Sequence, residues 1–213
     1  MSSNDNNAYW DGRFKNDGLI WGDKPNDGAL DTVKFFSDRN ESKRILDIGC
    51  GYGRDTSYFE KSGFVATGVD SSVEAIEIGK RLYPNLKLDV GNIVNLPYAE
   101  KSFDILYGYY ILHLLRKQDR SLLLRECKRV LDTNGYLIQT VASVNDSDYG
   151  QGEEFEENTF LSKRGVTKYF YSKDSLVNEL SEFKIIKLEE VKIHHTHDEP
   201  HDHYNLFVIA QNT

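Results

Sequence analysis

Three glycines spaced two residues apart, between an apolar run and an amphipathic one, constrain the fold of this chain more than any other feature. The segment reads Ile-Leu-Asp-Ile-Gly-Cys-Gly-Tyr-Gly over residues 45–53. Glycine lets the backbone turn sharply and approach a ligand closely, because it has no side chain. Open α/β sheets bind nucleotides at such a turn after the first strand. The segment therefore favours a nucleotide-binding core over a plain strand–helix turn.

The chain between residues 44 and 142 alternates short apolar runs with amphipathic ones. The apolar runs predict five strands, at Ile45–Ile48, Phe64–Val69, Leu86–Val90, Phe103–Tyr107 and Tyr136–Val141. The amphipathic runs predict helices between them, at Arg54–Ser62, Val73–Tyr83 and Arg120–Leu131. Strands that alternate with helices form βαβ units, and these units build a mostly parallel sheet with helices on both faces.

The N-terminal segment before this core is aromatic. We expect a short helix within Tyr9–Trp21, then a turn, then a second helix at Leu30–Arg39. The spacing of apolar residues in the second helix predicts that it buries Leu30, Val33 and Phe36.

The C-terminal segment after the core has a different pattern. Residues 143–163 are polar without a clear period, which predicts a long loop or lid whose apolar anchors are Phe155 and Phe160. A helix is expected at Lys173–Phe183, opened by Ser172. Two strands at 184–193 and 204–210 are too close in sequence for a parallel crossover, so they are expected to pair antiparallel.

Composition limits the classes of protein that this chain can belong to. Its 213 residues, 39% of them hydrophobic, suffice for one domain with one core. A net charge of −8 disfavours nucleic acid as a partner, because it repels phosphates. Two cysteines form no disulfide framework, residues 1–7 lack the apolar run of a signal peptide, and no run approaches the ~20 apolar residues of a membrane span. We therefore expect a cytoplasmic protein that contacts no membrane.

Two acidic residues near the glycines indicate the kind of nucleotide. Asp70 ends the second strand, roughly 20 residues after the first glycine, where an acid accepts hydrogen bonds from ribose hydroxyls. Ser71 or Ser72 can cap the following helix, which is expected to leave Asp70 for the ligand. Asp47 precedes the glycines, where it would repel a pyrophosphate. It suits a cationic ligand such as S-adenosylmethionine better than a nicotinamide dinucleotide.

Five segments in order resemble class I S-adenosylmethionine-dependent methyltransferases. They are Ile45–Arg54, Thr67–Asp70, Gly91–Tyr98, Ser102–Asp104 and Leu131–Tyr136. The resemblance implies a Rossmann-like, seven-stranded α/β sheet of order 3-2-1-4-5-7-6 with an antiparallel last strand. It also implies one domain over 1–213, made of an N-terminal cover at 1–43, a cofactor-binding half at 44–142 and a lid and substrate-side half at 143–213.

The family's cofactor contacts can be placed on this chain by their motifs. The resemblance implies that S-adenosylmethionine is bound by Asp47, Gly49, Cys50, Gly51, Gly53, Asp70, Ser71, Asn92, Ile93, Gly108 and Tyr109. The chain departs from the family pattern at Asn92, where the family usually has Asp. An Asn side-chain oxygen still accepts a hydrogen bond from the adenine amino group. It departs again at Asn134, where the family has Gly, and Asn tolerates the left-handed backbone best after Gly.

The resemblance implies an enzyme that moves a methyl group from S-adenosylmethionine to a small-molecule acceptor. His113 is the candidate general base, with a packing role as the alternative, and Trp21 and Tyr110 are expected to line the substrate pocket. The segment from Tyr9 to Asn26 is similar to the cover of methyltransferases that act on tellurite, thiols or thiopurines. A non-catalytic S-adenosylmethionine-binding protein acting through a partner is the alternative function. A monomer and a homodimer are both compatible with the sequence.

Five of the six histidines lie between residues 194 and 203. Alternation in a strand puts His195 and His197 on one face, and a hairpin brings His201 or His203 opposite them, which suits zinc or nickel. The spacing matches no established zinc pattern, however, and the segment has the polarity of a turn. The prediction therefore includes no metal site.

Overall fold

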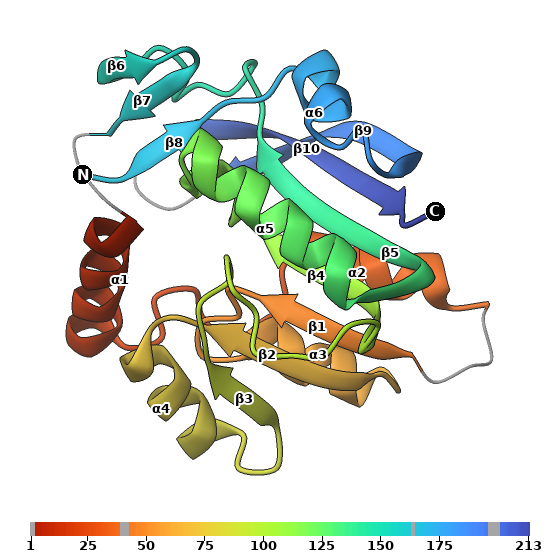
Figure 1. The fold of residues 1–213 in the computed structure, drawn as a ribbon. Coiled ribbons are helices and arrows are strands. Elements are labelled where there is room, and N and C mark those ends of the chain that lie inside the picture. Colours follow the sequence, from red (N-terminus) through yellow and green to blue (C-terminus); the bar gives the residue numbers. More distant parts are fainter. Residues whose placement is uncertain (1–2, 39–42, 163–164, 196–200) are drawn as a thin grey trace.

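The computed structural model describes residues 3–38, 43–162, 165–195 and 201–213, and its centre is a seven-stranded sheet (Figure 1). The strands stand in the order β3-β2-β1-β4-β5-β10-β9. Their bounds are β1 Arg44–Ile48, β2 Val65–Asp70, β3 Lys87–Val90, β4 Phe103–Tyr109, β5 Leu131–Ala142, β9 Lys184–His195 and β10 His201–Gln211. Strands β1 to β5 are parallel, and β10 is antiparallel to both of its neighbours. The predicted fold class and strand order are confirmed.

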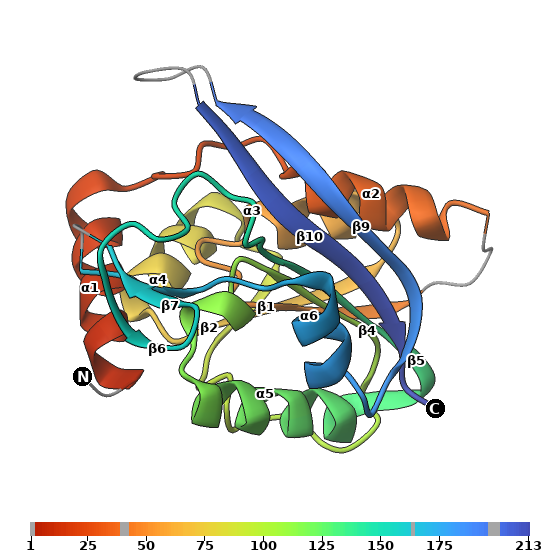
Figure 2. The ribbon, with the colours of Figure 1, turned by 90° about the horizontal axis from the view of Figure 1, so that it is seen from above.

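Helices cover both faces of this sheet (Figure 2). Their bounds are α1 Ser3–Asp17, α2 Asp27–Phe36, α3 Arg54–Lys61, α4 Val73–Leu82, α5 Lys117–Val130 and α6 Lys173–Glu179, with a 3-10 turn, η1, at Leu112–Leu114. One face packs on α2 and α3 through a cluster that includes Phe36, Phe59 and Tyr107. The other face packs on α5 and α6 through a cluster that includes Leu106, Leu123 and Leu176. Strands buried on both faces explain the continuous apolar runs in the sequence.

Helix α2 begins earlier than predicted, and its buried face differs accordingly. Asn26 caps the helix by accepting a hydrogen bond from the Ala29 amide at 2.8 Å. The buried positions are Gly28, Ala29, Thr32 and Phe36, whereas Leu30 is 43% exposed. The prediction that Leu30 is buried was wrong, because an apolar residue beside the true face has the same local spacing as one on it.

The predicted loop at 143–163 contains two strands, and a third follows it. Strands β6 Glu153–Glu156, β7 Thr159–Leu161 and β8 Thr167–Tyr169 form a separate antiparallel sheet in the order β6-β7-β8. Phe160 anchors it, as expected, by packing edge-on against Phe170 and Tyr149. The side chain of the other expected anchor, Phe155, lies outside the described residues. The two figures place this small sheet and α1 near the end of the large sheet where its parallel strands finish.

Helix α6 starts at the predicted cap. Ser172 accepts a hydrogen bond from the Ser175 amide at 3.0 Å, and the Ser175 hydroxyl accepts one from the Ser172 amide at 3.0 Å. The helix ends at Glu179, earlier than the predicted Phe183. Because the reciprocal pair satisfies two otherwise unpaired donors, we expect Ser172→Ala to lower the free energy of unfolding by about 1 kcal/mol. Urea unfolding of Ser172→Ala beside Ser181→Ala, which lies past the helix end, measures this; equal midpoints would contradict it.

Candidate functional site

The glycine loop joins β1 to α3 in a conformation that side chains disfavour. Gly49, Gly51 and Gly53 have φ angles of 71°, 56° and 81°. The amides of Gly49 and Cys50 both donate to the Val69 carbonyl oxygen, at 2.8 and 3.1 Å. The loop is thereby tied to the end of β2. All three glycines occupy the left-handed region, which glycine enters without the steric cost of a Cβ atom.

Asp70 links the loop to the start of α4. One carboxylate oxygen accepts from the Gly51 amide at 2.8 Å, and the other accepts from the Ser72 amide at 2.8 Å. Ser72 caps α4 through the Ala75 amide. The expectation that a serine, and not Asp70, caps this helix is confirmed, and Asp70 makes two local bonds of its own. Each of its oxygens still has a second lone pair for a ribose hydroxyl. Burial raises the pKa of Asp70, and the two amide bonds oppose that rise.

Asp47 lies beneath the loop and is only 3% exposed. Its carboxylate accepts a hydrogen bond from the Thr56 hydroxyl at 2.6 Å. Burial, reinforced by the negative charge of Asp55, raises the pKa of Asp47 well above its ordinary value. A positive charge bound nearby would favour the ionised form of this carboxyl group. The site thus combines a tightly tied glycine loop with a buried acid.

The turn after β3 is held by α5. Asn92 accepts a hydrogen bond through its side-chain oxygen from the Val94 amide at 3.0 Å, which leaves one lone pair on that oxygen. Glu126 accepts from the Leu96 amide at 2.7 Å. Arg129 donates to the carbonyl oxygens of Leu96 and Tyr98, at 3.0 and 2.7 Å. Ile93 lies half-buried in this turn, against the core beside α5.

The end of β4 carries two stacked tyrosines. The rings of Tyr109 and Tyr110 lie 4.3 Å apart between centroids. Tyr110 has a φ angle of 61°, which a bulky side chain rarely adopts, and its amide donates to the Thr140 carbonyl oxygen at 3.0 Å. Strain of this kind persists where surrounding contacts fix it, and it clusters at functional sites. Gly108, directly before them, packs against the Gln139 side chain.

His113 lies in η1, beside the end of β5. It is 3% exposed, and its Nδ1 accepts a hydrogen bond from the Ala142 amide at 3.0 Å. Burial lowers the pKa of His113 to about 3. The neutral ring therefore carries its proton on Nε2 and presents an N–H there, not a lone pair. The general-base role stays a prediction, and this arrangement does not favour it.

Helix α1 lies over the glycine loop. Phe14 packs edge-on against Tyr52, and a Cβ atom on Gly51 would lie 3.4 Å from the Phe14 ring. The Ser72 hydroxyl donates to Asp11 at 2.5 Å, which joins α1 to α4. Trp21, expected in the substrate pocket, is 54% exposed, and its amide and carbonyl groups bond to the Tyr52 hydroxyl and to Arg54.

A cavity of about 280 Å³ opens beside Tyr109 on the α2 face of the sheet. Residues from α2 and from strands β4, β5, β9 and β10 line it: Asp27, Gly28, Leu30, Asp31, Tyr109, Thr140, Val191, Lys192, Ile193 and Phe207. The hydroxyl oxygen of Thr140 is buried there and has no hydrogen-bond partner among the described residues. Among these lining residues, only Tyr109 is a site residue that the sequence predicts. The others come from segments that are far apart in the chain.

The loop, the acid at the end of β2 and the turn after β3 lie at the carboxyl edge of a Rossmann-like sheet, where open α/β sheets bind their ligands. A family model described as a methyltransferase domain matches residues 46–139, which contain all three features. The expected enzyme class agrees with that description. Among the described helices, none is long and apolar enough to cross a lipid bilayer.

The chain is similar to several methyltransferases. A fatty-acid O-methyltransferase of Mycolicibacterium smegmatis is 33% identical over 106 residues, which are 48% of this chain and only 38% of that protein. The 1,6-didemethyltoxoflavin-N1-methyltransferase of Burkholderia thailandensis, solved with 1,6-didemethyltoxoflavin and S-adenosylhomocysteine, has the same fold. The two structures superpose with a TM-score of 0.74 at 18% sequence identity. The superposition covers 100% of this chain and 91% of that one.

TehB of Haemophilus influenzae also shares the fold, with a TM-score of 0.68 at 15% identity over 96% of this chain and 67% of that one. A likeness at this identity is one of fold alone. It does not single out tellurite-, thiol- or thiopurine-type enzymes among the methyltransferases.

Proposed function

We propose that this chain binds S-adenosylmethionine and transfers its methyl group to a small-molecule acceptor. The observation that carries the proposal is the bond from the Gly51 amide to Asp70. The bond ties Asp70, the acid that we propose binds the ribose, to the left-handed glycine loop, within the segment that matches the methyltransferase domain.

The side chains at this edge carry the chemical groups that S-adenosylmethionine requires. Asp70 offers lone pairs to ribose hydroxyls, and Asn92 offers one to the adenine amino group. Asp47, buried beneath the loop with a raised pKa, suits a ligand that brings positive charge. When bound, S-adenosylmethionine supplies a methyl group on a positively charged sulfur, which an in-line nucleophile displaces.

The protein's own task is to align the acceptor and exclude water. Helix α1 covers the loop through Phe14, and the stacked Tyr109 and Tyr110 form a rigid wall at the end of β4. Alignment at near-attack distance contributes most of the rate when the leaving group is already activated. A general base adds to it only where the acceptor arrives protonated.

The alternative is a protein that binds S-adenosylmethionine without turnover and acts through a partner. Its loop and acids would be the same, so structure alone does not separate the two. The cavity beside Tyr109 favours the enzyme, because a binding protein for the donor alone needs no second pocket at this edge.

Calorimetry with S-adenosylhomocysteine tests the proposal first. We expect a Kd in the micromolar range, typical of enzyme substrates, and no binding of NADH. Release of S-adenosylhomocysteine is then measured against thiols, thiopurines, tellurite, phenols and amines. Binding without turnover on any acceptor would favour the partner-dependent alternative. Absence of binding would overturn the proposal.

A further inference from the structure

A second histidine lies at the same edge of the sheet as His113. His203 stands near the start of β10, and β10 pairs antiparallel with β5 so that Asn205 faces Ala142. The start of β10 therefore lies beside the end of β5, where the parallel strands finish. Asp146 follows in the turn just after β5, and its amide donates to the Ser143 carbonyl oxygen at 3.0 Å.

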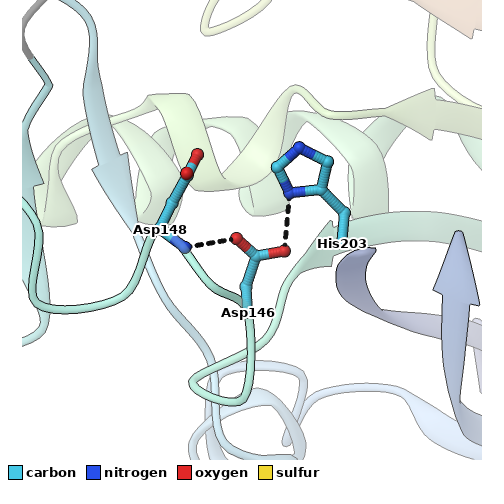
Figure 3. Close-up of side chains that lie close together, drawn as sticks. All are labelled: Asp146, Asp148 and His203. Atoms are coloured by element: carbon cyan, nitrogen blue, oxygen red, sulfur yellow. Dashed lines mark hydrogen bonds and ion pairs between the residues drawn. The ribbon is translucent and has the colours of Figure 1, made fainter. Parts of the chain in front are cut away.

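Asp146 holds the His203 ring in one orientation (Figure 3). Asp146 is 6% exposed, and one of its carboxylate oxygens lies 2.9 Å from Nδ1 of His203. The same oxygen accepts from the Tyr204 amide at 2.8 Å, and the other accepts from the Asp148 amide at 2.9 Å. The His203 contact and the amides lower the pKa of Asp146, so the group is ionised. An ionised carboxylate only accepts, so Nδ1 carries the proton and Nε2 of the neutral ring carries a lone pair.

The arrangement is the reverse of that at His113. There, Nδ1 accepts from a backbone amide, and Nε2 is the protonated nitrogen. At His203, Nδ1 donates to a buried acid, and Nε2 is the basic nitrogen, as in nucleophile–base pairs oriented by a third group. Beside the larger effect of burial, the negative charge of Asp146 acts to raise the pKa of both Tyr110 and His113. Asp146 and His203 therefore lie at the same edge of the sheet as the stacked tyrosines.

The same group of side chains has the composition of a metal site. Ligand atoms of Asp146, Asp148 and His203 lie within 4.8 Å of one another. Asp146, however, already accepts from three N–H groups, and Asp148 pairs with the Lys168 ammonium at 2.8 Å. Oxygens that are bonded to protons and to a cation suit an oriented histidine better than a divalent metal.

We propose that His203 is the general base for the methyl acceptor and that Asp146 is its positioning residue. The inference rests on the proposed methyl transfer. Nε2 of neutral His203 takes the proton from an acceptor X–H as the lone pair of X forms the bond to the methyl carbon. The carbon–sulfur bond breaks, and its electron pair stays on sulfur. The products are the methylated acceptor, S-adenosylhomocysteine and a protonated His203, which then releases its proton to water.

This role has a defined pH dependence. The hydrogen bond to Asp146 and the charges of Asp146 and Asp148 raise the pKa of His203, while burial and the Lys168 ammonium lower it; the net direction is upward. A base acts only when neutral. The ratio kcat/KM should therefore rise with pH and level off above the raised pKa of His203.

The test uses His203→Asn, whose amide can still donate to Asp146 and so preserves the fold, and Asp146→Asn. Asp202→Asn, one residue away, is the matched control. On the protonated acceptor (thiol, phenol or alcohol) with the greatest turnover, His203→Asn should lose kcat by roughly 100-fold and lose the low-pH limb. Its KM and S-adenosylhomocysteine affinity should stay within about twofold. In Asp146→Asn the rise of kcat/KM with pH should occur at lower pH. The pKa of His203 measured by NMR titration should fall by the same amount.

Three outcomes would overturn the inference. One is an unchanged rate and pH profile in His203→Asn while the wild type turns over, and another is turnover only on acceptors that arrive already ionised. The third is loss of wild-type rate on metal chelation with recovery on adding Zn²⁺, which would assign the cluster to a metal. A wild type that neither binds S-adenosylhomocysteine nor turns over contradicts the proposed function itself.

Discussion

Replacing Asp70 with Ala is expected to weaken S-adenosylhomocysteine binding by roughly 100-fold or more. Two ribose hydroxyls would each lose a hydrogen bond to a charged group, at about 1.5–3 kcal/mol per bond. The Gly51 and Ser72 amides would also lose their acceptor, so the loop would lose its tie to α4. Isothermal titration calorimetry measures the change directly.

Asp70→Asn separates the loss of the ribose hydrogen bonds from the loss of the tie between the loop and α4. Its single side-chain oxygen serves either the loop amide or the amide of α4, and its NH₂ group faces the other. We expect an affinity between those of the wild type and Asp70→Ala. Glu77→Gln, on the exposed side of the same helix, is the control for charge and should bind as the wild type does. Equal affinities in all four proteins would remove Asp70 from the site.

The cofactor half of the fold is predictable because its signals are local. A strand buried on both faces is a continuous apolar run, and α3 and α4 follow their strands at once. The glycines and Asp70 lie at the ends of such strands, so the topology alone brings them to one edge. Even here the sequence does not give the bonds that Asp70 makes, because these depend on the conformation of the loop.

The acceptor half is less predictable because its contacts are distant. Strands β6 to β8 are short, and the glutamates of β6 conceal any alternation of apolar residues. Asp146 and His203 are 57 positions apart, and only the antiparallel pairing of β10 with β5 joins them. The histidine-rich segment is visible in the sequence. Which of its members meets an acid is not, and His197 and the side chains of His194, His195 and His201 lie outside the described residues.

The sequence also does not distinguish a base from a donor among the histidines. His113 follows β4 by a few residues, and this position alone suggests a general base. The difference lies in the partner of Nδ1, which is a backbone N–H for His113 and a carboxylate for His203. Such partners come from other strands, so the protonated nitrogen is a property of the tertiary structure.

Replacing Gly49 with Ala is expected to lower the free energy of unfolding by about 2–5 kcal/mol. A left-handed residue with a Cβ atom costs roughly 1–2 kcal/mol. The new Cβ would lie 2.1 Å from Cδ1 of Ile111, and crowding of this kind costs roughly 1–3 kcal/mol. For a chain of this size the melting temperature should fall by about 5–15 °C. Thermal unfolding followed by circular dichroism measures it.

Two further variants separate strain from crowding. Gly51→Ala has a similar backbone cost, with φ 56°, but its Cβ would lie 3.4 Å from Phe14, an ordinary contact, so it should lose only about 1–2 kcal/mol. Gly49→Ala combined with Ile111→Ala removes the crowding atom. The double variant should therefore be more stable than the sum of the single losses predicts, by roughly 1–2 kcal/mol. Strict additivity would show that Ile111 moves aside freely and that backbone strain alone keeps a glycine at position 49.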